Sequence, residues 1–410
     1  MTFQRCKTFS YGLALGLTLT CAAGIAQARE TVKFTVAEYS SKTDPYYQQL
    51  AKEFNASQSD HKVVVETVSW DDLQTRLTTD ISAGTNSDLA IIGTRWLVGY
   101  VDEGIAAPLD KLLDKDIRER FIPAFLEPGT LDGKLYGVPV AASARAMFVN
   151  NDLLSQAGVS IPATLDEMEA AASKINALGK DIYGYGLQGN EIETDVYFYY
   201  TMWAEGGTLL SDDGSSNLAS KASLKAAERI QRMIRSNSVQ PSFLEDGREA
   251  VMNLFKTGRL GMVIAPPFMA KQLREEAPDV NWSIANIPAA SSSATYGVTD
   301  SIVLFENSRN KQGAVEFIDF MYSTEKRAEF SAGEGFLPVL KAVGAKPEFA
   351  ANPDVNTFVD MLPKARFAPT IAEWPEVASV TSDAIQAIYS GAPADKVLGK
   401  AEQRINRIIK

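Results

Sequence analysis

The stretch LDGKLYGVPVAASARAMFVNNDLL, residues 131–154, decides the expected fold. It begins with Asp132 and Gly133, a dipeptide that favours a tight hairpin turn between two short strands. The segment YGVP, residues 136–139, should be extended, because the residue before a proline avoids the helical region. Small residues follow, and then a second apolar strand over residues 146–149. A backbone that stays extended through small side chains suits a crossing between two lobes close to a ligand.

A longer string around this stretch, GVPVAASARAMFVNNDLLSQAGVSIPATLDEM at residues 137–168, resembles a signature of the extracellular solute-binding proteins of sugar ABC transporters. In that family the stretch is the first crossover from the N-lobe to the C-lobe, beside the ligand cleft. The chain has Val149-Asn150-Asn151 where Tyr-Asn-Lys is usual, and Leu165 where Trp is usual. These departures bear on which sugar is bound rather than on the family.

The resemblance implies an α/β fold of two lobes, the type II-like periplasmic-binding-protein fold. Each lobe would be a mostly parallel sheet covered by helices, and hinge crossovers would join the lobes. We expect the N-lobe to comprise residues 29–140 and 292–338. The C-lobe would comprise residues 141–291 and 339–410.

Hydrophobic periodicity predicts a β-α-β-α-β order in the first lobe, independently of the resemblance. The strands fall at residues 31–36, 63–68 and 89–92, and the helices at residues 44–55 and 71–83. Such an order gives a parallel sheet, and ligands of these sheets collect at the carboxyl ends of the strands. The rule selects the loops at residues 38–41, 69–72 and 94–96, which the resemblance also selects.

The first 28 residues have the pattern of a signal peptide. Arg5 and Lys7 precede an apolar run over residues 12–23, and Ala26-Gln27-Ala28 is a cleavage site. We therefore expect cleavage after Ala28 and a periplasmic product; a buried first helix is the alternative. Both cysteines, Cys6 and Cys21, lie in this segment, so no disulfide is expected after it. Cys21 could instead receive a lipid.

Charge argues against one class of partner. After residue 28 the chain has 38 Lys and Arg against 51 Asp and Glu, a balance of −13. Such an acidic surface repels phosphate backbones, so nucleic-acid binding is not expected. A small anionic ligand stays open, because a cleft can hold local arginines or helix N-termini.

The sequence offers few routes to catalysis. The single histidine, His61, is expected in a solvated loop, so Ser-His, Cys-His and zinc arrangements cannot be assembled. No catalytic residue, cofactor or metal is predicted; the Asp212-Asp213-Gly214 segment is expected to be a hairpin turn, with a calcium loop as the alternative. A glycosidase needs only two carboxylates and remains the enzyme alternative. Its candidates are Asp71, Asp72, Asp88, Glu191, Glu193, Asp195 and Asp300.

The predicted ligand site combines aromatic faces for the C–H side of a sugar with polar groups for its hydroxyls. Trp70 and Trp96 could contact ligand or pack between lobes, whereas Trp282 and most of residues 197–203 are expected in the core. Arg145 and Arg366 are cleft cations or members of structural ion pairs; if either faces the ligand, an acidic or sulfonated sugar becomes plausible. The aromatic candidates are Tyr39, Trp70, Trp96, Phe198, Trp203, Phe268, Phe336 and Trp374. The predicted ligand-binding set is Tyr39, Ser41, Trp70, Asp71, Asp88, Thr94, Arg145, Gly189, Asn190, Trp203, Phe268, Thr299, Asp300, Phe336 and Arg366.

Together these features predict the substrate-binding component of an ABC importer. It would be a monomer that closes around a monosaccharide, oligosaccharide, polyol or modified sugar and delivers it to the membrane permease. The alternatives are a glycosidase and a binder of another solute, such as a polyamine, a peptide or ferric ion. The sequence does not name the sugar.

Overall fold

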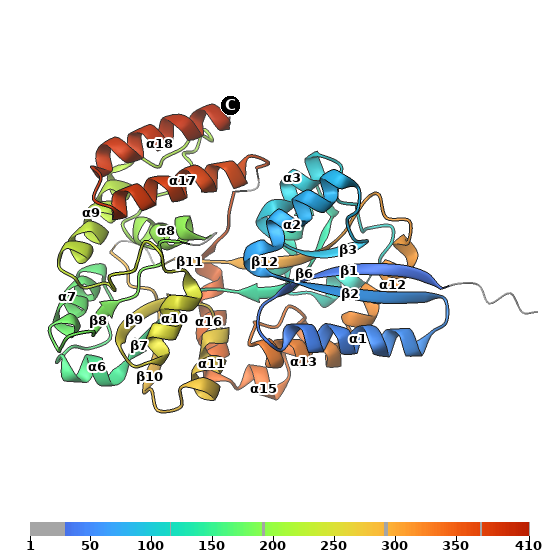
Figure 1. Cartoon of the computed structure of the whole chain (residues 1–410), viewed down its shortest axis with the longest axis horizontal. Helices are drawn as coiled ribbons and strands as arrows, with labels where there is room; N and C mark the ends of the chain where they lie inside the picture. Colours follow the sequence, from blue (N-terminus) through green and yellow to red (C-terminus); the bar gives the residue numbers. More distant parts are fainter. Residues whose placement is uncertain (1–28, 115, 191–192, 291–293, 370, 410) are drawn as a thin grey trace, which may run out of the picture.

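The computed structural model describes residues 29–114, 116–190, 193–290, 294–369 and 371–409, which form two lobes side by side (Figure 1). The predicted signal peptide, Glu191 and the serine run at 291–293 lie outside the described residues. No helix among the described residues is both long and apolar enough to span a bilayer.

The N-lobe is built on a five-stranded sheet in the order β2-β1-β3-β12-β6. β1 (Glu30–Glu38) pairs in parallel with β2 (His61–Ser69) and β3 (Leu89–Gly93), and α1 (Thr43–Ser57) and α2 (Trp70–Ala83) connect them. This confirms the predicted β-α-β-α-β order. β12 (Val298–Leu304) runs antiparallel between β3 and β6 (Gly137–Ser143). Its first residues therefore lie at the edge where the parallel strands end.

Further short elements complete this lobe. They are η1 (Thr94–Trp96), α3 (Leu97–Asp102), α4 (Ile117–Arg120), α5 (Pro123–Leu126), η2 (Glu127–Gly129), α12 (Lys311–Met321), α13 (Thr324–Glu334), α14 (Lys341–Gly344) and α15 (Pro347–Ala350).

The C-lobe has a mixed four-stranded sheet in the order β10-β7-β9-β8. β7 (Ala146–Asn150) is antiparallel to β10 (Trp282–Ala285) and β9 (Leu260–Ala265), and β8 (Tyr183–Tyr185) is parallel to β9. The helices around it are α6 (Asn151–Gln156), α7 (Leu165–Asn176), α8 (Thr194–Ala204), α9 (Lys221–Arg235), α10 (Arg248–Lys256), α11 (Phe268–Glu276), α16 (Pro353–Met361), α17 (Trp374–Tyr389) and α18 (Ala394–Ile408).

The stretch over residues 131–154 crosses between the lobes as the sequence predicts. β4 (Thr130–Leu131) and β5 (Lys134–Leu135) form the hairpin, with positive φ at Asp132 (49°) and Gly133 (75°). β6 then belongs to the N-lobe sheet and β7 to the C-lobe sheet, so the chain changes lobe at residues 144–145. A second connection passes through β11 (Thr295–Tyr296), which pairs in parallel with β13 (Ala365–Arg366) after η3 (Leu362–Lys364).

The lobe limits inferred from the resemblance stay a prediction, but the strands refine where we place them. β6 remains in the N-lobe sheet through Ser143, three residues beyond the predicted limit at 140. α14 packs on α13, and Leu340 forms a bridge with Phe121. We therefore propose that the N-lobe also includes residues 141–143 and 339–350.

Two expectations about single residues are wrong. His61 is buried at the start of β2, because its ring packs beside Gly313 of α12 and lies near Glu30 and Glu316. Trp282 is only partly buried; one face meets Phe148 and the Arg274 guanidinium lies 5.3 Å from its ring centroid. By contrast, every residue of α8 is buried, as predicted for residues 197–203.

Candidate functional site

Two adjoining cavities lie between the lobes. The first, the aromatic cavity, has a volume of about 340 Å³ and lies between η1, η2, β12 and the segment 367–369. The second, the charged cavity, has a volume of about 350 Å³ and lies between the loops after β1 and β2, β6 and the starts of α10 and α11. Trp70, Glu193, Val298 and Asp300 line both, so the cavities form one continuous site.

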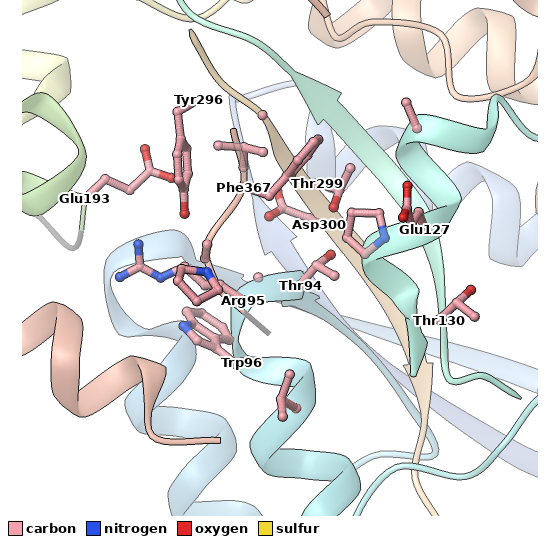
Figure 2. Close-up of a pocket in the computed structure, with 18 of the residues that line it drawn as sticks. Thr94, Arg95, Trp96, Glu127, Thr130, Glu193, Tyr296, Thr299, Asp300 and Phe367 are labelled. Carbon is pink, nitrogen blue, oxygen red and sulfur yellow. The ribbon is translucent and has the colours of Figure 1, made fainter. Parts of the chain in front are cut away.

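Two stacked tryptophans form one wall of the aromatic cavity. The rings of Trp70 and Trp96 are 5.7 Å apart between centroids, at an interplanar angle of 21°. Trp70 begins α2, and Trp96 ends η1 beneath Gly93, where an added Cβ would lie 3.3 Å from the indole. Phe367 and Thr299 lie across the cavity from η1 in Figure 2. The arrangement offers an apolar face flanked by hydroxyl and carboxyl groups.

The charged cavity is organised around a buried ion pair in the C-lobe. Arg145 donates to Glu193 Oε2 over 2.7 Å, and Arg248 Nη1 lies 3.7 Å from the same oxygen. Both Arg145 and Glu193 are buried. Burial alone would raise the pKa of Glu193, but the Arg145, Arg248 and Arg95 guanidinium groups hold it below its usual range. Glu193 is therefore a carboxylate held in a positive environment.

Asp300 lies where the two cavities meet. It belongs to β12 at a register shift between Asp300 and Ser301, a bulge that can re-aim a side chain. Tyr39 Oη donates to Asp300 Oδ2 over 2.9 Å, while the buried Oδ1 has no hydrogen-bond partner among the described residues. Burial raises the pKa of Asp300 to about 7, although the Tyr39 hydrogen bond acts in the opposite direction.

Several contacts bridge the lobes around the site. Phe268 of α11 packs against Phe336 with ring centroids 5.6 Å apart, and Phe336 also meets Tyr39. Arg95 of η1 lies 3.8 Å from the buried Asp195 of α8. These contacts join N-lobe and C-lobe elements, so the structure shows the lobes drawn together over the site.

The structure brings most of the predicted ligand-binding set to the cavities. The residues that line them are Tyr39, Ser41, Trp70, Asp71, Thr94, Arg145, Phe268, Thr299, Asp300 and Phe336. Their contact with a ligand stays a prediction. Arg145 is a member of a buried ion pair, which was the alternative to a free cation.

Five predicted residues lie outside both cavities. Asp88 sits at the amino end of β3, where it accepts from Lys33 N at 2.8 Å and from the Ser308 hydroxyl at 2.6 Å. A carboxylate at that end of the strand is far along the sheet from the ligand edge. Gly189 and Asn190 are instead tied to the Asp246 carbonyl through their backbone N–H groups.

The last two of these five residues, Trp203 and Arg366, pack against each other. Trp203 is buried in the core, its ring stacked on Tyr296 at 14°, and the Arg366 guanidinium lies 5.4 Å from its centroid. Arg366 also donates to the Gly207 carbonyl. Phe198 and Trp374 are core residues as well, because α8 and α17 face each other.

Several residues of the site are not among those predicted from the sequence. Arg95 and Arg248 follow no motif that separates them from other arginines, and Tyr296 and Phe367 reach the site through the β11–β13 pairing. Glu193 was noted only as a carboxylate candidate. Of these residues, only Arg95 could have been predicted as a site residue from the sequence, because it lies within the predicted ligand-facing loop at residues 94–96.

Comparisons with known proteins agree with the two-lobed fold. Residues 39–328 match the family model described as bacterial extracellular solute-binding protein. A binding protein of Brucella abortus (strain 2308) is 48% identical over 408 residues, covering 98% of this chain and 99% of the relative. The maltotriose-binding protein of Pyrococcus abyssi is 23% identical over 371 residues, covering 88% of this chain and 78% of the relative.

Solved structures share the fold. A solute-binding protein of Thermotoga lettingae with bound α-D-tagatose superposes with a TM-score of 0.86 at 22% identity, covering 93% of this chain and 100% of that one. One from Agrobacterium vitis with bound D-mannitol has a TM-score of 0.79 at 21% identity, covering 92% and 98%. Both are two-lobed proteins of ABC transporters, like the arrangement in Figure 1.

Proposed function

This chain belongs to the family of bacterial extracellular solute-binding proteins, and on that premise we propose that it is the sugar-binding component of an ABC importer. It is exported to the periplasm after cleavage behind Ala28 and works as a monomer. It captures a saccharide or polyol between its lobes and delivers it unaltered to the membrane permease. The relative named for maltotriose binding and the two solved structures with bound tagatose and mannitol support a carbohydrate ligand.

The observation that carries the proposal is the make-up of the interlobe site. The Trp70–Trp96 stack offers an apolar wall for the C–H face of a sugar ring, and Thr94, Thr299 and Asp300 supply polar groups beside it. Each cavity, near 340 Å³ and 350 Å³, falls in the range of small-molecule sites. A polyhydroxyl ligand with one apolar face matches this combination.

The position of the site explains how binding would be signalled. The walls come from both lobes, so a ligand makes its full set of contacts only when the lobes are together. Such a ligand binds the closed form better than the open form and shifts the population toward closure. The permease can then distinguish loaded from empty protein by the outer surface.

A panel experiment tests the proposal. The mature chain, residues 29–410, is heated with monosaccharides, oligosaccharides and polyols, and with a polyamine, short peptides and ferric citrate as the other solute classes. We expect at least one carbohydrate to raise the melting temperature, since a ligand at 100 times its Kd adds about 2.7 kcal/mol to stability. A shift with none of the carbohydrates, or only with another class, contradicts the proposal.

One observation favours a glycosidase as the second candidate. Asp300 and Glu193 both line the two cavities, and their environments push their pKa values in opposite directions, as in an acid and nucleophile pair. Against it, the Glu193 carboxylate is held by Arg145. Steady release of chromophore from aryl glycosides, lost in both Asp300→Asn and Glu193→Gln, would establish the enzyme.

A further inference from the structure

We propose that the ligand carries a protonated amino group and that Asp300 is its counter-charge, so that the substrate class is amino sugars. The inference rests on the proposed function, because it names the chemistry of the solute that the interlobe site takes. It depends on three features of the site: its charge, the state of its arginines and the free oxygen of Asp300.

The cations of the site are already neutralised. Arg145 is paired with Glu193, and Arg248 lies 3.7 Å from both Glu193 and Glu249. Arg95 faces Asp195 across the lobes at 3.8 Å. Every guanidinium group that lines the cavities therefore has a carboxylate within 4 Å. An acidic or sulfonated sugar, which the sequence left open, would find no unpaired arginine among these three.

The carboxylates of the site exceed its cations. The cavities are lined by six carboxyl groups of described residues: Glu193, Glu249, Asp300, Glu38, Asp71 and Glu127. The last three have no salt-bridge partner within the described part of the chain. Counted over the described residues, the lining thus has six carboxyl groups against three guanidinium groups. A cavity with this balance attracts cations and repels anions.

Asp300 gives that charge a specific place. The residue is only 5% exposed, yet it lines both cavities, and its buried Oδ1 has no hydrogen-bond partner among the described residues. Figure 2 shows it beside Thr299, facing the cavity formed by Arg95 and Trp96. A buried carboxylate that accepts a single hydrogen bond is costly. A sugar hydroxyl would satisfy the hydrogen bond, but only an ammonium group would also balance the charge.

The groups that face Asp300 set the expected pH dependence. Tyr39 donates to it, Glu193 opposes its ionisation, and Arg145 and Arg248 favour it. Since burial raises the pKa of Asp300 to about 7, acid converts it to the neutral form and removes the counter-charge. Binding of an amine should therefore weaken as the pH falls from 7 to 5, where the amino group stays protonated, by up to about tenfold per pH unit.

Matched probes test the inference by calorimetry at pH 7. D-glucosamine, D-galactosamine, D-mannosamine and glucosamine dimers and trimers are compared with their hydroxyl, N-acetyl and uronic acid counterparts. We expect at least one amine to bind tenfold or more tightly than each of its counterparts. Asp300→Asn should reduce that preference to below threefold, while Asp279→Asn, the same change at an exposed site outside both cavities, should preserve it.

The outcomes separate the inference from the proposed function. If a neutral or acidic saccharide is the tighter ligand, or if Asp300→Asn keeps the preference, the inference is overturned and the proposed function stands. If no saccharide of any charge binds, both fail. Should Asp300→Asn not fold, the wild-type pH profile decides: amine affinity that is constant from pH 7 to pH 5 overturns the inference.

Discussion

Replacing Glu193 by Gln removes the charge that holds two arginines together at the centre of the site. In the wild type the carboxylate accepts from Arg145 Nη2 at 2.7 Å and lies 3.7 Å from Arg248 Nη1. Arg145 is 2% exposed, so its guanidinium cannot recover its hydration when the partner is lost. A glutamine at this position would keep the size of the side chain and one carbonyl acceptor, but not the counter-charge.

The expected loss is large for one substitution. Removing one partner of a buried ion pair costs about 3–5 kcal/mol, because the other charge is left buried and uncompensated. For a lobe of 150–250 residues this corresponds to a fall in Tm of roughly 6–20 °C. The fall should be greatest near neutral pH. Since the pKa of Glu193 is lowered in the folded chain, its contribution is present above the unfolded pKa and is lost on acidification below it.

Thermal unfolding followed by circular dichroism, without ligand and at pH 7, measures this loss. Glu249→Gln is the matched control, because Glu249 faces the same Arg248 from the surface, with 58% of its side chain exposed. An exposed pair contributes about 0–1 kcal/mol, so this variant should melt close to wild type. If Glu193→Gln melts within 1 °C of Glu249→Gln, the buried ion pair does not organise the site as described.

Three further changes probe other parts of the structure. Trp70→Ala should weaken ligand binding by about 1.5–3 kcal/mol, roughly 10-fold to 100-fold in the Kd from calorimetry, because the apolar wall is lost. Trp282→Ala, which lies outside the cavities, should leave this Kd unchanged. Without ligand, Asp300→Asn should melt above wild type at pH 8 and lose most of that advantage by pH 5. The raised pKa of Asp300 gives stability that is complete only below the unfolded pKa and disappears as pH rises through about 7, so an equal gap in Tm at both pH values refutes the burial of that charge. Gly297→Ala should destabilise the chain by about 1–3 kcal/mol, because its Cβ would lie 2.3 Å from the Phe367 ring, while Gly399→Ala, with open space around it in α18, should be neutral or stabilising in urea unfolding.

Much of the framework could be predicted because it depends on local patterns. Alternating apolar residues marked β1, the Asp132-Gly133 turn marked the hairpin, and the small residues of 137–146 marked the crossing between lobes. The rule that ligands collect at the carboxyl ends of parallel strands placed Tyr39, Trp70 and Thr94 in the site. These positions follow from the order of elements alone.

What the sequence could not predict depends on contacts between distant segments. Asp88 and Asp300 are both aspartates beside apolar strands, and only the antiparallel insertion of β12 puts Asp300 at the ligand edge while Asp88 caps the opposite end of β3. The sequence left Arg145 open between a cleft cation and a member of an ion pair, because its partner Glu193 lies 48 residues away along the chain. Nothing in the local sequence separates Trp203 from Trp70. Trp203 is nevertheless buried, because it lies on α8, which packs on α17, and its ring stacks on Tyr296.

Small-angle scattering of the mature chain, with and without its saccharide, tests the central claim most directly. We expect the radius of gyration to fall when saturating ligand is added, because a solute held by walls from both lobes keeps them closed, and we expect Trp70→Ala to need more ligand for the same change. An identical radius with and without a tightly bound saccharide would contradict the account of a protein that closes on its ligand.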